Sequence, residues 1–429
     1  MNQKKVALFT VGCKLNQYET EWMGESLEKA GFKRVGFSEQ ADLYIVNTCT
    51  VTAQSDYSSR QAIYRASRRS PGSKIAVVGC YSEIEPDFLN KLPGVSLVLG
   101  NEEKRRIGEV IQERLYKKTP VIGEQKSRIA GRFKHTRALV KIQDGCNESC
   151  SYCIVPKARG SERSRDAKEI VEEIKGLSDE GFKEVVLTGV HIGKYSKNGL
   201  DLTGLLKKIL TETQVERIRL SSIEPKELGE ELIKLLATEK RICRHLHLPL
   251  QAGSNEILKK MKRNYTVEEY ADLIQDVIER IDGVTIGADV MVGFPGEKEQ
   301  DFEKTCELAL SSPLSYLHVF SYSDRKGTLA SDMKDKITPQ TIHQRSEILH
   351  RIGKEKWEKH LETFAGKEME ILVESDRDKN SGRLIGLTDN YIRILVNGED
   401  KLKNKLLSVK VIDREDKFLT GEIQTLSHE

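Results

Sequence analysis

The sequence predicts an α/β fold in three parts: an N-terminal parallel α/β domain, a central partial barrel of the (β/α)6 type, and a small C-terminal antiparallel β-barrel. Up to about residue 360, short apolar segments alternate with helical segments, a pattern typical of parallel sheets. From residue 366 onward the helical period disappears, and short strands separated by turns remain. The chain of 429 residues is long enough for several domains with their own cores.

The N-terminal domain is expected over residues 1–120. Helical patterns at 17–30 and 55–69 separate apolar segments of strand length, which indicates a parallel sheet. The predicted strands are 6–10, 43–47, 75–79 and 96–100. The polar, basic segment 121–135 is expected to be a linker.

The central barrel is expected over residues 136–360, because strand and helix patterns alternate there for about six rounds. Its predicted strands are 139–143, 184–188, 217–221, 245–248, 285–292 and 316–321. The third part is expected over residues 366–429 as a small β-barrel. Its predicted strands are 368–374, 383–387, 391–396, 407–412 and 418–424.

Three cysteines in one short run carry the strongest chemical signal. Cys146, Cys150 and Cys153 have the spacing C-x3-C-x2-C and follow the first predicted barrel strand. Iron–sulfur clusters bound by cysteine normally use four thiolate ligands. Three thiolates would leave one iron of a cubane cluster open to an exogenous ligand, which suits a reactive cluster better than a purely structural one.

Three further cysteines occupy equivalent places in the N-terminal domain. Cys13, Cys49 and Cys80 each come just after a predicted strand. The carboxyl ends of parallel strands lie along one edge of a sheet, where ligand sites form, so these thiols can converge. One such cysteine is more often a small buried hydrophobic residue, but three favour a second three-thiolate cluster. Cys243 and Cys306 lack this placement and are expected to serve packing.

The distribution of charge favours a polyanionic partner. The net charge is only +3, but residues 57–74 hold five basic side chains and no acidic one. Residues 101–145 hold 12 basic and six acidic side chains. Such runs are typical of nucleic-acid-binding surfaces, although solvated helix faces remain an alternative.

The cysteines and the apolar segments also bear on location. No apolar segment approaches the roughly 20 residues needed to span a membrane, so no membrane partner is expected. Eight cysteines without a recognisable secretory signal favour metal or redox chemistry in the cytoplasm.

These features together resemble the radical S-adenosylmethionine methylthiotransferases, over essentially the whole chain. The resemblance is carried by the GC…NTC…GC pattern of the first domain, the C-x3-C-x2-C run, and a terminal barrel of the TRAM type. The motif GCKLNQYE at residues 12–19 is most similar to the branch that modifies N6-threonylcarbamoyladenosine beside the anticodon of tRNA. The isopentenyladenosine and ribosomal-protein branches usually carry different residues there.

The resemblance implies two [4Fe–4S] clusters, one on each set of cysteines. In the family, the cluster on Cys146, Cys150 and Cys153 binds S-adenosylmethionine, which yields a 5′-deoxyadenosyl radical. The cluster on Cys13, Cys49 and Cys80 would hold sulfur or polysulfide at its open iron. One S-adenosylmethionine methylates that sulfur and another provides the radical. A flavodoxin or ferredoxin system for electrons and a sulfur donor are implied as partners.

Residues near the barrel strand ends are candidates for binding S-adenosylmethionine. They are Tyr152, Thr188, Gly189, Ser222, Glu224 and Gln251. The family has an aromatic residue at the place of Tyr152 and backbone contacts at the place of Thr188-Gly189. Ser222, Glu224 and Gln251 would bond the ribose or the methionyl tail, or else serve as turn or cap residues. His247 and Asp289 are expected to be satisfied polar groups of the core.

Two groups of side chains are candidates for tRNA binding. Arg159, Arg163 and Arg165 follow the cluster loop and are expected to hold phosphate near the radical. Tyr64 and Arg68 share one face of the helix at 55–69, where stacking on bases is expected. A plain amphipathic helix would explain that face equally well.

Three further points bear on the RNA-binding role of the C-terminal barrel, on the substrate and on the class of protein. Residues 366–429 hold 11 basic and 13 acidic side chains, so RNA binding there would need a local patch. The substrate could instead be a ribosomal protein side chain. A non-enzymatic iron–sulfur or zinc module is the remaining alternative, but structural zinc sites usually have four ligands, and two sets of three cysteines fit that poorly.

Overall fold

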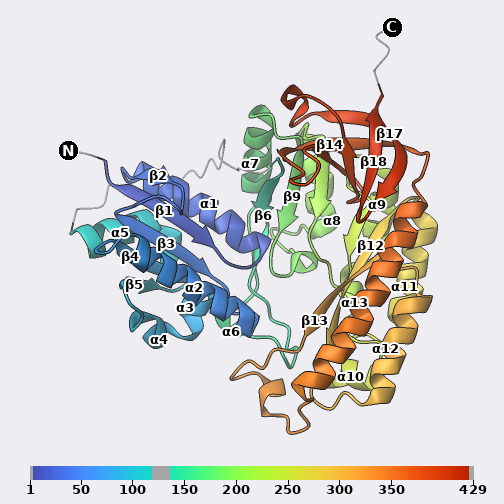
Figure 1. The fold of residues 1–429 in the computed structure, drawn as a ribbon, viewed down its shortest axis with the longest axis horizontal. Helices are drawn as coiled ribbons and strands as arrows, with labels where there is room; N and C mark the ends of the chain where they lie inside the picture. The colour runs from blue at the N-terminus through green and yellow to red at the C-terminus, as the bar shows by residue number, and fades with distance from the viewer. Residues whose placement is uncertain (1–2, 118–135, 425–429) are drawn as a thin grey trace.

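The computed structural model describes residues 3–117 and 136–424, so the predicted linker 121–135 lies outside the described residues. The N-terminal domain lies beside the central barrel, and the C-terminal barrel caps one end of the central barrel (Figure 1). The predicted α/β fold class is confirmed, with parallel sheets in the first two parts. Within the described residues, no helix has the length and apolar character needed to cross a membrane.

A five-stranded parallel sheet forms the N-terminal domain, with the order β2-β1-β3-β4-β5. Its strands are β1 Lys5–Thr10, β2 Lys33–Val35, β3 Leu43–Thr48, β4 Lys74–Gly79 and β5 Val95–Leu99. Its helices are α1 Lys14–Lys29, α2 Ala53–Arg69, α3 Cys80–Ile84, α4 Pro86–Asn90 and α5 Ile107–Tyr116, with a 3-10 turn η1 at Glu103–Arg106. The four predicted strands are present. The edge strand β2 was missed because its three residues form no apolar run.

Helices cover both faces of this sheet. All six residues of β3 are buried, because α1 packs on one face and α2 on the other. Met23 and Leu27 of α1 belong to one apolar core, whereas Ala62 and Ile63 of α2 belong to the second. The sheet is therefore covered by helices on both of its faces.

Six parallel strands form the central partial barrel. They are β6 Ala138–Lys141, β9 Glu184–Thr188, β10 Arg217–Leu220, β11 His245–His247, β12 Thr285–Val292 and β13 Tyr316–Ser321. They form two sheets, β6-β9-β10 and β11-β12-β13, that meet through a bridge between Ile218 and Ile242. Within residues 136–424, β6 and β13 have no pairing with each other, so the barrel is open on one side.

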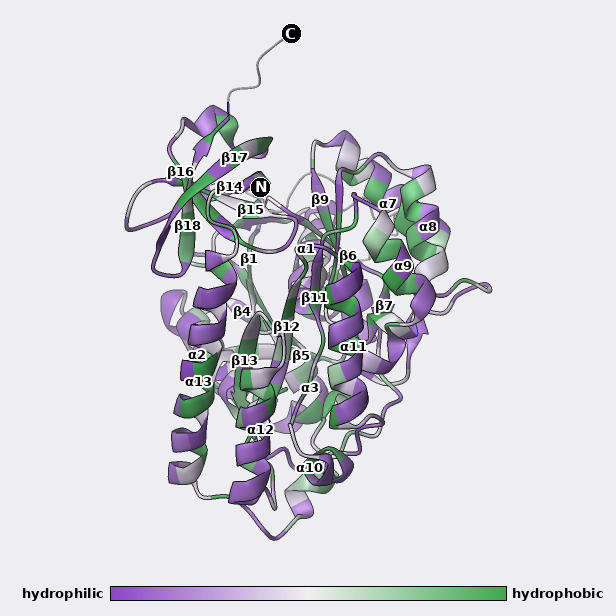
Figure 2. Ribbon diagram, turned by 90° about the vertical axis from the view of Figure 1, so that its right-hand side faces the viewer, coloured by the Kyte–Doolittle hydropathy of each residue, from purple (hydrophilic) through white to green (hydrophobic). Residues whose placement is uncertain are grey.

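Helices cover the convex face of these strands. The larger helices are α7 Ala167–Asp179, α8 Leu202–Glu212, α9 Glu230–Thr238, α11 Val267–Arg280, α12 Glu299–Ser311 and α13 Pro339–Glu362. Short helical segments are α6 Val155–Arg159, η2 Ile192–Lys194, η3 Pro225–Glu227, α10 Asn255–Lys260 and η4 Leu329–Asp332. Hydrophobic and hydrophilic residues alternate along α11, α12 and α13, as expected for helices that bury one side (Figure 2). The apolar side chains of the strands pack beneath them.

The concave face of the barrel is polar by contrast. His247 on β11, Asp289 on β12 and His318 on β13 contact one another across the strands. Helix α1 of the N-terminal domain lies across the open side, where Tyr18 packs on Leu139 of β6 and Val186 of β9. The concave face therefore meets the N-terminal domain.

The C-terminal part is a closed barrel with the order β14-β15-β16-β18-β17. Its strands are β14 Glu368–Arg377, β15 Leu384–Thr388, β16 Arg393–Val396, β17 Leu406–Glu415 and β18 Phe418–Ile423, with a 3-10 turn η5 at Asp400–Leu402. The predicted small β-barrel is confirmed and its pairings are antiparallel, with the exception of β16 and β18, which pair in parallel. These two strands are not consecutive, and their pairing closes the barrel without a hairpin.

Candidate active site

The loop of the three barrel cysteines is closed at its base by a short ladder. Strand β7 (Gln143–Asp144) precedes the loop and pairs antiparallel with β8 (Arg163–Ser164). Gly145 has φ +73°, and a Cβ there would lie 2.0 Å from the Ser161 carbonyl oxygen. Only glycine fits this turn without distortion.

The three thiols of this loop are half-buried and lie near one another. Cys146, Cys150 and Cys153 are all partly accessible. Burial and the neighbouring Cys150 and Cys146 raise the pKa of the Cys153 thiol to about 12, although the Val155 backbone N–H opposes the rise. Thiols become metal ligands by losing their proton, and three such groups fit a cluster with one open iron in number and in donor chemistry.

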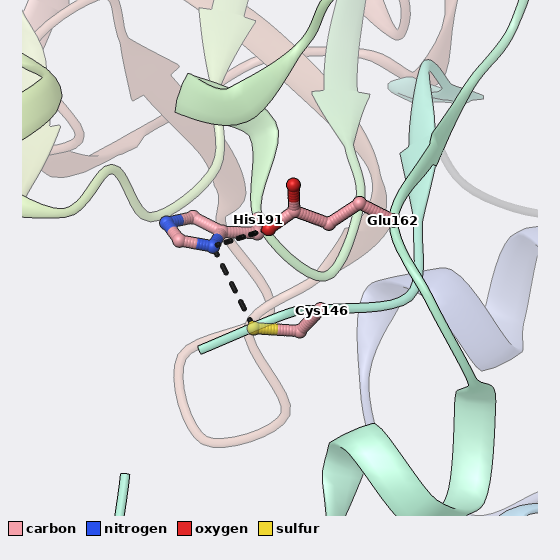
Figure 3. A group of neighbouring side chains, drawn as sticks. All are labelled: Cys146, Glu162 and His191. Atoms are coloured by element: carbon pink, nitrogen blue, oxygen red, sulfur yellow. Dashed lines mark hydrogen bonds and ion pairs between the residues drawn. The ribbon is translucent and has the colours of Figure 1, made fainter. Parts of the chain in front are cut away.

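His191 contacts the first of these cysteines. Its Nδ1 lies 3.6 Å from Cys146 Sγ and 3.7 Å from Glu162, as Figure 3 shows, and its Nε2 lies 2.6 Å from Glu227. Burial lowers the pKa of His191, but the contacts with Cys146 and Glu227 raise it to about 9. A cationic donor therefore faces the cysteine sulfur. His191 was not predicted, because nothing in its local sequence marks it as a residue of this site.

Arg263 contacts the second cysteine. Its Nη1 donates a hydrogen bond of 3.3 Å to Cys150 Sγ, and its Nη2 pairs with Glu224. Its guanidinium also lies 5.1 Å above the Tyr265 ring. Glu224, predicted to bind S-adenosylmethionine, is thus the partner of a cation beside the cysteine loop.

The other residues predicted to bind S-adenosylmethionine lie at or near the carboxyl ends of strands. Thr188 is buried at the end of β9, and its carbonyl accepts a bond from the Ile142 N–H. Gly189 follows, and a Cβ there would lie 2.8 Å from the Gln143 carbonyl. Gln251 has φ +67°, which is rare for a residue with a side chain and marks a constrained turn.

Ser222 and Tyr152 complete that set. Ser222 is exposed just past β10. Tyr152 is half-buried in the cysteine loop, and its ring packs edge-on against Phe294 at 6.4 Å. The ring of Tyr152 therefore lies in the same loop as the three thiols.

The three cysteines of the N-terminal domain follow three adjacent strands. Cys13 comes after β1, Cys49 after β3 and Cys80 after β4, and these strands are neighbours in the sheet. Gly12 has φ +101°, and a Cβ there would lie 2.8 Å from Cys49 Sγ. The loop after β1 therefore lies directly against the Cys49 side chain. Cys13 is exposed, whereas Cys49 and Cys80 are buried.

Cations lie beside this second set of thiols. Burial raises the pKa of Cys80 to about 11, while the charges of Arg159 and Lys104 oppose the rise, and the nearby thiols of Cys13 and Cys49 add to it. Helix α1 begins directly after Cys13, so its positive N-terminal end lies at this site. The donor set and its charge environment fit a second cluster with three thiolate ligands.

Arg159 belongs to a buried network of charges between the N-terminal domain and the barrel. Its guanidinium lies 3.2 Å from Glu19, 3.0 Å from Asp144 and 2.6 Å from Asn16. Lys104 and Lys141 also bond to Glu19. Glu19 and Asn16 lie on α1, so the network joins the two cysteine-bearing parts.

The three arginines predicted to bind phosphate are all paired with carboxylates in the structure. Arg159 is only 5% exposed and is fully engaged by Glu19 and Asp144. Arg163 bonds Asp144 at 3.1 Å, and Arg165 bonds Glu173 at 2.7 Å and the Tyr18 hydroxyl at 3.2 Å. Arg159 is thus held inside the protein, whereas Arg163 and Arg165 are partly exposed and Arg163 Nε has no hydrogen-bond partner among the described residues, so a phosphate contact by these two stays a prediction.

The predicted helix face for RNA is only partly available. Tyr64 is half-buried against the core of the N-terminal domain, so its ring is not free to stack on a base. Arg68 is exposed on α2 and donates to the Tyr64 carbonyl at 3.3 Å. Nearby, Arg65 and Arg69 are also exposed, which keeps a basic surface on this helix.

A second contact joins the Cys49 loop to the barrel. Arg325, after β13, donates bonds of 2.7 Å to both Thr50 and Asp56. The Ala53 N–H donates to Ser323 Oγ at 2.9 Å. The sheet edge that carries Cys49 is thus fixed against the barrel from both of its sides.

Comparisons with known proteins decide the family. Residues 140–309 match the Radical SAM superfamily, residues 5–100 match the Uncharacterized protein family UPF0004, and residues 362–423 match the TRAM domain. The threonylcarbamoyladenosine tRNA methylthiotransferase MtaB of Aquifex aeolicus is 40% identical, over 95% of this chain and 100% of that protein. The chain belongs to the radical SAM methylthiotransferase family.

Further relatives agree with this membership. The Bacillus subtilis MtaB is 37% identical over 95% of this chain and 93% of that protein. A tRNA-2-methylthio-N(6)-dimethylallyladenosine synthase of Pelotomaculum thermopropionicum is 33% identical over 99% of both chains. Membership in this enzyme family excludes the alternative of a non-enzymatic iron–sulfur or zinc module.

Solved structures share the fold. The radical S-adenosylmethionine methyltransferase TsrM of Kitasatospora setae, with cobalamin and a [4Fe–4S] cluster bound, has a TM-score of 0.60 at 16% identity. The match covers 77% of this chain and 74% of that one. At this identity the likeness speaks for the fold alone.

Proposed function

We propose that this enzyme methylthiolates carbon 2 of N6-threonylcarbamoyladenosine next to the anticodon of tRNA. It would use two [4Fe–4S] clusters, and S-adenosylmethionine both as methyl donor and as radical source. The observation that carries the proposal is the presence of two three-thiol sites, joined by the Arg159 network, in a chain about 40% identical to an enzyme named for this substrate.

The barrel site would hold the radical-forming cluster through Cys146, Cys150 and Cys153. His191 and Arg263 would donate to the sulfurs of Cys146 and Cys150, and such hydrogen bonds help set the reduction potential of an iron–sulfur cluster. When bound, the cluster and S-adenosylmethionine supply a radical that can remove hydrogen from a ring carbon too weakly acidic for any side-chain base.

The N-terminal site would hold the cluster that carries the sulfur or polysulfide to be transferred. Cys49 and Cys80 are buried in the sheet edge, whereas Cys13 faces outward, so one side of the site remains accessible. Arg159 and Lys104, although paired with Glu19, oppose the rise in the pKa of Cys80, so their positive charges would favour thiolates at this site. The contacts of α1 and Arg325 with the barrel would keep this site in a fixed place relative to the radical.

The partners follow from this chemistry. Exposed Arg65, Arg68 and Arg69 on α2 would contact the tRNA backbone, and the C-terminal barrel would add a local patch. A flavodoxin or ferredoxin system would deliver electrons, and a separate sulfur donor would renew the N-terminal site. We place the enzyme in the cytoplasm, where its tRNA substrate is found.

The decisive experiment is mass spectrometry of tRNA nucleosides from a host that lacks this activity, with and without the gene expressed. The methylthio form of threonylcarbamoyladenosine is expected only when the gene is present. Appearance of the methylthio isopentenyl nucleoside alone would overturn the substrate and retain the enzyme class. If neither appears with protein that carries both clusters, ribosomal proteins should be analysed for the same modification.

A second candidate substrate is isopentenyladenosine in tRNA. The relative from Pelotomaculum thermopropionicum, named for the dimethylallyl nucleoside, covers 99% of this chain at 33% identity. The higher identity to the MtaB proteins favours threonylcarbamoyladenosine.

A further inference from the structure

A pocket of about 290 Å³ lies where the three parts of the protein meet. Lys14 contributes from the start of α1, Thr136 and Arg137 from the chain entering β6, and Tyr391 and Arg393 from the C-terminal barrel. The pocket thus exists only when all three parts are assembled. Lys14 directly follows Cys13 in the chain, so one residue of the pocket is next in sequence to the N-terminal cysteine site.

Lys14 is the least compensated charge in this pocket. Its charged neighbours are the cations Arg137 and Arg219 and the carboxylate Glu184, with the phenol of Tyr391 beside them. Among the residues that the structure describes, Lys14 has no carboxylate at ion-pair distance. A half-buried ammonium group without such a partner is well placed to bind a ligand that supplies the negative charge.

The carboxylates around Lys14 are engaged elsewhere or lie at the rim. Glu184 pairs with Arg219 at 2.6 Å, and Glu374 pairs with Arg137 at 3.3 Å. Asp376 also lines the pocket, but it is exposed. Arg393 is an exposed cation at the opposite wall. The interior of the pocket therefore carries positive charge that the protein itself does not neutralise.

Tyr391 reports the same electrostatic environment. Its backbone has φ +72°, and its ring stacks on His245 at 4.3 Å and lies 5.2 Å from the Arg219 guanidinium. Burial would raise the pKa of its phenol, but Lys14, Arg137, Arg219 and Arg393 together hold that pKa below its ordinary value. A strained tyrosine held among cations is a suitable donor to an anion.

We propose that this pocket binds the carboxylate of the threonylcarbamoyl group, with Lys14 as the main contact and Tyr391 and Arg393 as further donors. The inference rests on the proposed function and adds the residues that determine specificity. In adenine, ring nitrogen 1 lies between carbon 2 and the carbon that carries N6. The N6 substituent and the reacting carbon therefore share one edge of the base.

That chemistry matches the position of Lys14. A group that binds the N6 substituent must lie close to the site that supplies sulfur to carbon 2, and Lys14 is bonded to Cys13 through the backbone. An isopentenyl group carries no charge, so it would leave the half-buried ammonium of Lys14 without a partner. Leaving a polar group of the site unpaired discriminates against the wrong substrate.

The test compares two anticodon stem-loop RNAs that differ at one group. One carries threonylcarbamoyladenosine, and the other carries the same nucleoside with its carboxylate converted to a neutral carboxamide. We expect the wild-type enzyme to methylthiolate the carboxylate RNA with a kcat/KM roughly 10- to 100-fold higher, the range for one charge-assisted hydrogen bond. The difference should lie mainly in KM.

Variants identify the residue responsible. Lys14→Gln should remove most of that preference by slowing only the carboxylate RNA, and Lys14→Arg should retain part of it. Arg393→Gln, at an exposed position that does not endanger folding, should reduce it less. Lys410→Gln is the matched control, because Lys410 is an exposed cation of the same barrel on β17, outside the pocket.

The outcomes separate this inference from the proposed function. If the wild type does not modify the carboxylate RNA but modifies a dimethylallyladenosine RNA, the proposed function fails. If the wild type modifies both test RNAs equally well, the pocket does not read the carboxylate and the inference is overturned. Equal slowing of both RNAs by Lys14→Gln would mean that Lys14 binds an RNA phosphate, which also overturns it.

Discussion

The two cysteine sites differ in how they are built. Cys146, Cys150 and Cys153 come from one loop, closed at its base by the β7–β8 ladder. Cys13, Cys49 and Cys80 come from three strand ends that only the folded sheet brings together. The first site depends on a local turn, whereas the second depends on the whole N-terminal domain.

This difference in construction is matched by a difference in surroundings. The loop thiols are half-exposed and contact the donors His191 and Arg263. In the N-terminal site, Cys49 and Cys80 are buried, and the cations Arg159 and Lys104 oppose the rise in the Cys80 pKa that burial causes. Each site can therefore be disabled separately, and the readouts should differ.

The largest effect is expected for Cys150→Ala. Loss of one of only three ligands should prevent the barrel cluster from forming, and without it both 5′-deoxyadenosine and the methylthio product should be undetectable. The measurement is reductive cleavage of S-adenosylmethionine, followed by chromatography, with anaerobically reconstituted protein. Normal 5′-deoxyadenosine production by this variant would remove the loop from the radical step.

Cys49→Ala should divide the activities. The barrel loop is untouched, so 5′-deoxyadenosine should still form within a few-fold of the wild-type rate. Methylthiolation should stop, because the sulfur-carrying site has lost a buried ligand. Iron analysis should show about half of the wild-type iron, in keeping with one cubane cluster remaining. Continued methylthiolation by this variant would contradict the assignment of the N-terminal site.

A matched pair of glycine variants tests the two constructions directly. Gly12 and Gly145 each precede the first cysteine of a site, with φ of +101° and +73°. An added Cβ would lie 2.8 Å from Cys49 Sγ in one case and 2.0 Å from the Ser161 carbonyl in the other. Gly12→Ala should therefore lower iron binding at the N-terminal site, and Gly145→Ala at the barrel site.

Gly181→Ala is the control for backbone strain alone. Gly181 also has positive φ, +92°, but no atom lies within 4 Å of its added Cβ. It should cost about 1–2 kcal/mol of stability and leave both clusters loaded. Electron paramagnetic resonance of the reduced proteins distinguishes the two sites. Equal loss of both signals in either cysteine-site variant would mean that the sites do not form independently.

The two sets of three cysteines could be recognised as candidate ligand sites from the sequence, because strand ends and ligand spacing are local signals. It could not predict the role of Arg159, because the partners Glu19 and Asn16 lie on α1, far away along the chain. A basic run after a cluster loop has the same composition whether it binds phosphate or a buried carboxylate. The contact of His191 with Cys146 likewise depends on closure of the barrel.

The parallel pairing in the C-terminal barrel also depends on contacts between segments that are not consecutive in the chain. The strands of the C-terminal barrel, and its antiparallel character, were predicted from short apolar runs separated by turns. In the barrel, β18 lies between β16 and β17, and it pairs with β16 in parallel. Pairing between strands that are not consecutive is set by barrel closure and leaves no trace in either strand.

The smallest effects are expected at Cys243 and Cys306, which lie outside both sites. Burial raises the pKa of Cys243 to about 12 and that of Cys306 to about 11, as it also raises that of Cys80 to about 11. A raised thiol pKa therefore does not separate ligands from packing residues.

What separates them is the company of other thiols. Cys80 has Cys13 and Cys49 beside it, whereas Cys243 is surrounded by charged side chains such as Arg219 and Glu184, and Cys306 by Glu297 and Glu299. Cys243→Ala and Cys306→Ala should thus keep full iron content and methylthiolation, with about 1 kcal/mol lost from the free energy of unfolding. A fall in iron content in either variant would show that a fourth thiol takes part in a cluster. That cluster would then have no open iron, contrary to the proposal for both sites.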